Sequence, residues 1–258
     1  GSPSGTSPLR AGDCGGNSGI TFPAPKTVYW NLAGTQLWTA TAWATSSGGA
    51  PSINNFPLSQ DTAVFNDAGA AGTISASAGQ TAGSIDMSAR TSAMTINLST
   101  MNVHGSLSFG TGVTNNSSSE LFFKGRGTST ITSNGVEFPH PVAIDCWSGT
   151  VQLADAFSIT GGNNALSLDS GVFDAVTYNV TIPALSGSTA SNINGINPRT
   201  GIRMGSGLWT LTGSSAVWNL ISSASLDPGT SSILLSSTAA STRTFTSGGL
   251  SYPKITIG

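Results

Sequence analysis

Charge is scarce in this sequence. Charged residues make up 8% of the 258 positions, whereas ordinary soluble domains have about a quarter. Nine basic and eleven acidic residues leave a formal net charge of −2, and no basic run could follow a phosphate backbone. We therefore expect no nucleic-acid partner. Serine, threonine, glycine, asparagine and alanine fill the surface instead, a composition common in extracellular β-proteins and virion fibres.

Long apolar runs are also missing. No stretch approaches the roughly 20 apolar residues that a membrane-spanning helix needs, and none has the charged start and apolar centre of a signal peptide. We expect no membrane insertion. The hydrophobic fraction of 38% and the mean hydropathy of +0.08 are nevertheless sufficient for a folded core.

Cysteine and histidine are too few and too scattered to predict a metal site. Cys14 and Cys146 form no CxxC pair. They could form a long-range disulfide in an oxidising compartment or remain free thiols. His104 and His140 have no third ligand at a useful spacing. We expect no metal, and we expect His140 to lie in an exposed polar turn.

Catalytic signatures are absent as well. The sequence has no nucleophile elbow, phosphate-binding loop or dinucleotide fingerprint, and its many glycines fall between β-strand patterns. We therefore expect no catalytic residues, no cofactor and no enzymatic activity.

What the sequence does contain is a stretch used twice. Residues 130–144 read TITSNGVEFPHPVAI and residues 244–257 read TFTSGGLSYPKITI. Two such copies suggest a repeating architecture. The second copy stops at Gly258, and we expect the chain to end inside a repeat.

Short alternating segments fill the chain from Gly72 onward. Met94, Ile96 and Leu98 fall on one face of such a segment, which is the period of a strand with one buried face. Strands this short, separated by Gly, Asn and Ser turns, predict an all-β fold: a right-handed parallel β-helix (β-solenoid) over residues 69–258. Coils of about 20 to 25 residues would give about seven to ten turns. A β-sandwich or jelly roll is the alternative.

Two further regions precede this solenoid. Residues 1–25 are rich in Gly, Ser and Pro and predict an extended arm or linker, held either by a neighbouring subunit or by its own domain. Residues 26–68 contain Trp30, Trp38 and Trp43. These tryptophans predict either a cap that closes the end of the solenoid or a platform on which sugar rings stack.

The same region carries a resemblance. The pattern YW…W…W…P…DTAVF from Tyr29 to Phe65, followed by Gly-rich alternating strands up to Ile85, resembles β-helical regions of phage virion appendage proteins such as tail fibres and spikes. It is also similar to the start of autotransporter-type passenger repeats. The resemblance implies a structural virion protein for host attachment at the virion surface. Its implied partners are other virion proteins, further copies of this chain (a homo-oligomer such as a trimer) and a host surface glycan. The alternative is a bacterial surface adhesin or autotransporter passenger, at the cell surface or secreted.

Candidate ligand-contacting residues follow from loops and aromatics. Residues 186–203 lack alternation and predict a loop, and loops on a regular β-scaffold often bind ligands. The candidate glycan contacts are Trp30, Trp38, Trp43, Asn192, Asn194, Arg199 and Arg203.

Four carboxylates define the third hypothesis, an extracellular polysaccharide-degrading enzyme. Stacked coils could bring side chains from different turns onto one face, where paired acids transfer protons. Alternatively, each aspartate caps its own turn. The residues are Asp145, Asp155, Asp169 and Asp174.

Overall fold

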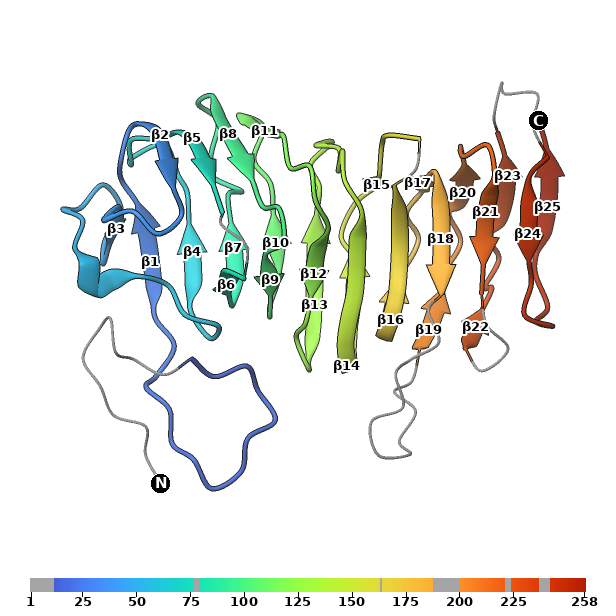
Figure 1. Ribbon diagram of the computed structural model, residues 1–258, viewed down its shortest axis with the longest axis horizontal. Coiled ribbons are helices and arrows are strands. Elements are labelled where there is room, and N and C mark those ends of the chain that lie inside the picture. Colours follow the sequence, from blue (N-terminus) through green and yellow to red (C-terminus); the bar gives the residue numbers. More distant parts are fainter. Residues whose placement is uncertain (1–11, 77–78, 163, 188–199, 221–223, 237–241) are drawn as a thin grey trace.

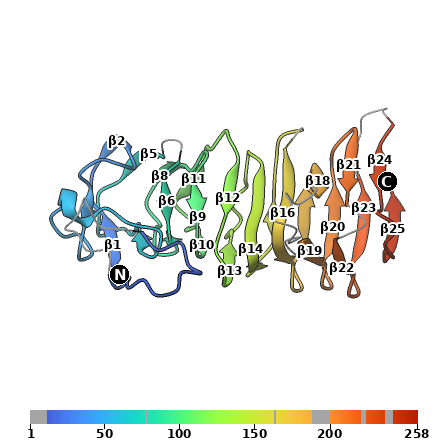
Figure 2. The same cartoon turned by 60° about the horizontal axis from the view of Figure 1, so that its bottom comes forward.

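The computed structural model describes residues 12–76, 79–162, 164–187, 200–220, 224–236 and 242–258. It is a β-solenoid of about 8 turns, elongated along one axis (Figures 1 and 2). The predicted parallel β-solenoid is confirmed. Its strands pair in parallel, with β1 (Thr27–Trp30) and β3 (Trp43–Ala44) the antiparallel exception among the described residues, so the sandwich alternative is wrong.

The strands stack into three faces that run along the axis. Face A contains β1, β4 (Thr62–Val64), β7 (Ser84–Asp86), β10 (Leu107–Ser108), β13 (Thr128–Thr132), the second halves of β14 (Val142–Leu153) and β16 (Ala165–Asp174), β19 (Thr200–Arg203) and β22 (Ser225–Asp227). Face B contains β2 (Gly34–Leu37), β5 (Gly72–Ser75), β8 (Met94–Asn97) and β11 (Val113–Asn115). After one turn in which the described residues form no strand on this face, it continues as β15 (Phe157–Ser158), β17 (Val180–Ile182), β20 (Leu208–Leu211), β23 (Ser232–Leu235) and β25 (Lys254–Ile257). Face C contains β6 (Thr81–Ala82), β9 (Asn102–Val103), β12 (Leu121–Phe123), the first halves of β14 and β16, β18 (Ala184–Gly187), β21 (Ala216–Asn219) and β24 (Thr244–Thr246).

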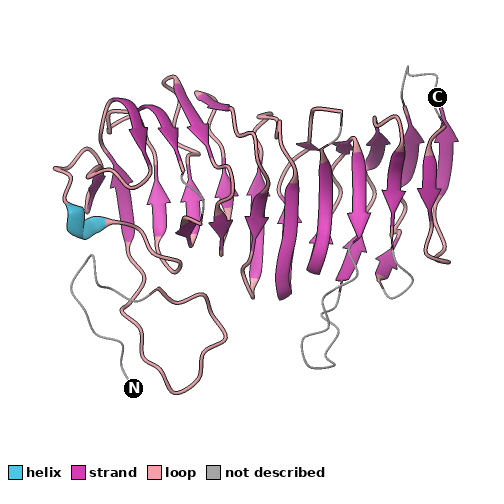
Figure 3. Cartoon of the chain, in the orientation of Figure 1, coloured by secondary structure: helices cyan, strands magenta, loops and turns pink. Residues whose placement is uncertain are grey.

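The interior is filled by the alternate residues of these strands. Met94, Ile96 and Leu98 are buried, as the alternation predicted. An aromatic column continues the core along the axis, with neighbouring ring centroids 5.0 to 6.0 Å apart. It consists of Phe109, Phe138, Phe157, Phe173, Trp209, Trp218 and Phe245. Strands dominate the fold (Figure 3), and the one helical element in the described residues is the short 3-10 turn η1 (Ile53–Asn55).

Glycine recurs at one corner of the solenoid. Gly83, Gly105, Gly127, Gly149 and Gly171 follow one another at intervals of 22 residues, and Ala63 and Ile85 pair at the same separation. A Cβ on Gly149 would lie 2.3 Å from the Gly125 carbonyl oxygen. At Gly149 the backbone of the preceding turn therefore approaches too closely for a side chain, whereas a Cβ on Gly127 would meet nothing within 4 Å.

The repeated stretch does not mark equivalent strands. Thr130 lies in β13 on face A, whereas Thr244 lies in β24 on face C. What the two copies share is a tight turn. Its two central residues have positive φ in both, at 49° and 79° for Asn134 and Gly135 and at 63° and 74° for Gly248 and Gly249. The duplicated sequence therefore encodes a local turn of the type that Asn-Gly and Gly-Gly pairs favour.

The two ends of the solenoid differ. At the N-terminal end β3 runs along the outer edge of β1, and β1 continues through β4 into β7, so the Trp-rich region forms the first turns of the same sheet. At the other end β24 and β25 are edge strands, and Ile257 is 75% exposed.

The described part of the N-terminal arm is held by its own chain. The Asp13 amide donates to the Gln60 side-chain oxygen at 2.9 Å, and the Gln60 amide donates to the Pro23 carbonyl at 3.4 Å. The Lys26 amide donates to the buried Asp61 carboxylate at 3.0 Å. Residues 12–26 therefore fit the own-domain alternative for the arm.

Candidate functional site

The predicted tryptophan platform is closed to ligands. Trp38 is 0% exposed, and Trp30 and Trp43 are each 1% exposed. Trp30 and Trp43 pack edge to face with ring centroids 5.2 Å apart. Phe65 contacts all three indoles, stacked on Trp30, tilted against Trp38 and edge to face with Trp43. Because no indole face is open to solvent, the prediction that sugar rings stack on these tryptophans is wrong. Their geometry is that of a cap, which buries aromatic area at the end of the solenoid.

The predicted binding loop is shorter than expected. Its ends are strands, since Ser186 lies in β18 and Arg203 lies in β19. Asn192, Asn194 and Arg199 lie outside the described residues. Arg203 pairs with the Asp174 carboxylate at 3.4 Å across neighbouring turns of face A, so it contributes to the surface of the solenoid wall.

Two of the four candidate carboxylates have local roles. Asp155 accepts hydrogen bonds from the backbone amides of Ser133 and Asn134, which fixes the tight turn. Asp174 accepts from the amide of Val176 at 2.9 Å, an aspartate that caps its own turn. The predicted cluster of four is therefore wrong, because these two carboxylates bind backbone amides or side chains away from the other two.

The other two carboxylates share face C. Phe122, Ala143 and Ser167 are paired in register on three successive turns. Two residues further along the chain, the side chains point outward again. These outward positions hold Lys124, Asp145 and Asp169. Lys124 Nζ lies 2.5 Å from Asp145 Oδ2. Together with Glu120 from the same face, Lys124, Asp145 and Asp169 are called the charged row below. Sequence reasoning found Asp145 and Asp169 but missed Glu120 and Lys124.

Two acids of the charged row are held toward their protonated form. Burial raises the pKa of Asp169, the Asp145 charge adds to the rise, and Lys124 opposes it. Burial also raises the pKa of Glu120, a hydrogen bond with Ser167 lowers it, and the Asp169 charge raises it further. Carboxyl groups with raised pKa on an accessible face are what general acid catalysis uses.

A bulge in β14 lies beside the charged row. The Ser170 hydroxyl donates to Asp145 Oδ1 at 3.0 Å and accepts from the Trp147 amide at 2.7 Å. The ladder shifts register on both sides of Asp145, and Trp147 has a φ of 48°, which is rare for a bulky residue. The bulge therefore fixes the position of Asp145.

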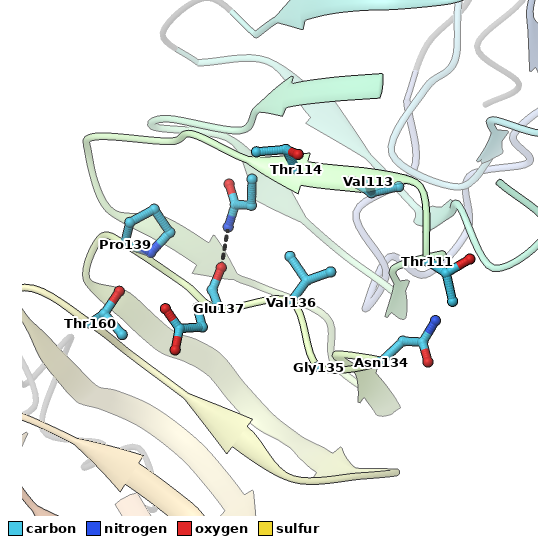
Figure 4. Close-up of a pocket in the computed structure, with 10 residues that line it drawn as sticks. Thr111, Val113, Thr114, Asn134, Gly135, Val136, Glu137, Pro139 and Thr160 are labelled. Carbon is cyan, nitrogen blue, oxygen red and sulfur yellow. Dashed lines mark hydrogen bonds between the residues drawn. The ribbon is translucent and has the colours of Figure 1, made fainter. Parts of the chain in front are cut away.

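A hollow of about 400 Å³ opens on another side, where face B is interrupted. It lies between β11 with its preceding turn, residues 134–139 and Thr160, and is called the edge pocket below (Figure 4). The interruption has a cause in the sequence. Pro139 and Pro141 have no amide hydrogen for a ladder, and the segment meets the next turn through one bridge, Phe138 with Ile159.

His140 contacts Asn115, one of the residues that line the edge pocket. It is 0% exposed, so the predicted exposed turn is wrong. Its Nδ1 lies 2.9 Å from the Pro141 carbonyl, which leaves Nε2 to accept from the Asn115 amide at 3.3 Å. Asn115 reaches it from the preceding turn. Burial lowers the pKa of His140, and the Pro141 carbonyl opposes this.

The cysteines form no disulfide. Cys14 is exposed and Cys146 is buried, and both are free. Burial raises the pKa of the Cys146 thiol to about 11. Within the described ranges, no three His, Cys, Asp or Glu side chains are grouped closely enough to hold a metal ion. In the same part of the chain, no helix is long and apolar enough to span a membrane.

Comparison of the chain with protein-family models, curated protein sequences and solved structures found no match.

Proposed function

We propose that this chain is a β-solenoid segment of a virion surface appendage, such as a tail fibre, spike or capsid appendage, that takes part in host attachment. The observation that carries the proposal is the stack of parallel ladders, which continues through one 16-stranded sheet and two further sheets. Each turn is hydrogen-bonded to the next on its faces, so bending the rod must distort many ladders at once. Stiffness of this kind suits an appendage.

Surface chemistry supports the same function. The outward positions of the strands carry mostly hydroxyl and amide side chains, as in the row of Thr35, Thr73, Thr95 and Thr114 on face B. Low charge leaves the sides of the rod free of a strong field. In this proposal the sides meet other virion proteins, copies of the same chain and a host surface glycan.

Location on particles tests the proposal. Virions from the source of this sequence would be purified and labelled with an antibody raised against residues 26–258, and then imaged by cryo-electron microscopy. Label in symmetric copies on the particle surface is the expected result. Label on bacterial cell envelopes instead would refute the virion assignment in favour of the adhesin or autotransporter alternative, which uses the same rod.

The charged row supports a second candidate, an extracellular polysaccharide-degrading enzyme. Glu120 and Asp169 lie on one face and have raised pKa values. On the same face the Lys124 ammonium forms an ion pair with the Asp145 carboxylate. The test is release of reducing ends from neutral and acidic polysaccharides by the intact protein. Glu120→Gln and Asp169→Asn would each abolish release, whereas Asp86→Asn, at the end of β7 on face A, would not. Absence of release from every polysaccharide would refute this candidate.

A further inference from the structure

The edge pocket exists because the solenoid wall lacks a strand there. β11 is the edge strand of its sheet, and the segment that should pair with it in the next turn forms a tight turn and then a proline-flanked bridge. Where a ladder would have run, the Asn115 side-chain amide donates to the Glu137 carbonyl at 3.1 Å. The wall is therefore open to solvent at one position on this face.

The walls of the pocket are held in place from behind. Asp155 binds the backbone amides of Ser133 and Asn134, which fixes the turn that presents the Asn134 side chain. Asn115 Oδ1 accepts from the Ser117 hydroxyl at 2.7 Å. The Ser117 hydroxyl in turn accepts from the Leu98 amide at 2.7 Å. A pocket ordered before binding loses little conformational entropy when a ligand enters.

The lining mixes polar groups with small apolar surfaces. Figure 4 shows Thr111 and Asn134 at one end of the drawn residues, Val136 between, and Glu137 and Thr160 at the other end. These side chains offer hydroxyls, an amide and a carboxylate, and Val136 with Pro139 adds apolar contact. The volume of about 400 Å³ falls within the range of about 300–1,000 Å³ that small-ligand sites have.

From this chemistry we infer that the edge pocket binds a short stretch of neutral saccharide. Sugar hydroxyls need donors and acceptors in close alternation, which the threonines, Asn134 and Glu137 supply, and the C–H faces of the ring pack on Val136 and Pro139. The lining contains one carboxylate and no cation, so anionic sugars are repelled. The exposed hydroxyls and amide exclude a lipid tail because burying them without partners is costly.

This inference deepens the proposed function, because it names a site at which the appendage would contact a host glycan. It rests on the proposed function only in assigning the saccharide to a host surface. Binding at the pocket and location on the virion are separate measurements, so either can fail alone.

The test is a nuclear magnetic resonance titration of the isotope-labelled protein with cellotetraose, mannotetraose, tetra-N-acetylchitotetraose and tetragalacturonate. At least one of the three neutral tetrasaccharides should shift the resonances of Gly135 and the Asn134 side-chain amide, and tetragalacturonate should not. If no neutral tetrasaccharide shifts them, or if tetragalacturonate binds there more tightly, the inference is wrong.

Variants make the assignment specific. Asn134→Gly combined with Glu137→Gln should weaken binding at least tenfold, and glycine accepts the positive φ of that position. Thr160→Val, which removes a hydroxyl at nearly constant shape, should weaken it severalfold. Asp227→Asn removes an exposed carboxylate from the end of β22 on face A and should leave affinity within twofold. Unchanged affinity in the first two variants, or loss in the third, would overturn the pocket as the site.

Discussion

Acidification should destabilise this protein because of His140. The imidazole is buried and neutral, with its Nδ1 hydrogen bonded to Pro141 and its Nε2 accepting from Asn115. Protonation would convert Nε2 from an acceptor into a donor that faces the Asn115 amide, which is also a donor. It would also place an uncompensated positive charge inside the core, which is costly. His140 therefore binds a proton less readily in the folded protein than in the unfolded chain.

The sign and size follow from linkage. Burial depresses the native pKa of His140 below its ordinary value of 6.5, so the unfolded state binds more protons and the free energy of unfolding decreases as pH falls below 6.5. Between pH 7.5 and 5.5 the loss is at most about 1.4 kcal/mol for one histidine that stays neutral when folded. The half-buried His104, whose pKa is also lowered by burial, adds a smaller loss of the same sign.

Two carboxyl groups, those of Glu120 and Asp169, act in the opposite direction and at lower pH. Glu120 and Asp169 have native pKa values raised above 4.5 and 3.8, so the folded state binds their protons more tightly and gains stability as they protonate. The histidine effect is therefore clearest above pH 5.5.

Urea unfolding followed by tryptophan fluorescence at pH 7.5, 6.5 and 5.5 measures the effect. His140→Gln should flatten the pH dependence by up to about 1.4 kcal/mol whatever its absolute stability, and His104→Gln serves as the matched control that retains most of it. A free energy of unfolding that stays constant or increases between pH 7.5 and 5.5, or the same slope in His140→Gln, would refute the reasoning.

Three further predictions concern the core, the glycine corner and the thiols. Trp218→Ala should cost about 3–5 kcal/mol of unfolding free energy, because the ring is buried and stacked on the next turn; a cost below about 1 kcal/mol would contradict this packing. Gly149→Ala should lower the melting temperature, because its Cβ meets backbone oxygen, whereas Gly162→Ala, which meets nothing within 4 Å, should not; equal melting temperatures would contradict the close approach. A thiol reagent should modify Cys14 quickly and Cys146 only on unfolding, as exposure and the Cys146 pKa of about 11 imply; two equally fast thiols would contradict the burial of Cys146.

The sequence predicted the fold where local pattern and tertiary structure agree. The alternation at Met94, Ile96 and Leu98 is sufficient to predict a strand with one buried face, because the side-chain period is a local property. The cap that contains Trp30 lies in the first turns of the solenoid, because β1 pairs with β4 in the same sheet. Turn length was also encoded, in the 22-residue spacing of Gly83 through Gly171, a signal stronger than the duplicated stretch.

Contacts between turns were predicted poorly. Asp155 and Asp145 are near in sequence but bind different partners, because a few residues decide the face on which a side chain lies. His140 looked exposed between two prolines, yet its partner Asn115 comes from the preceding turn. Lys124 could have been found from the length of one turn, because a turn of about 22 residues places it beside Asp145. The register shift at the bulge is not visible in the sequence.

The uneven spacing of the ladders has a consequence for engineering. Ala63 pairs with a residue 22 positions later, whereas Leu185 pairs with Trp218, which is 33 positions later. Both pairs are parallel, so the solenoid accepts extra chain between turns without losing the alignment of its strands. A foreign epitope could be spliced between β18 and β19, and the parallel strands on either side would display it at a fixed place along the rod.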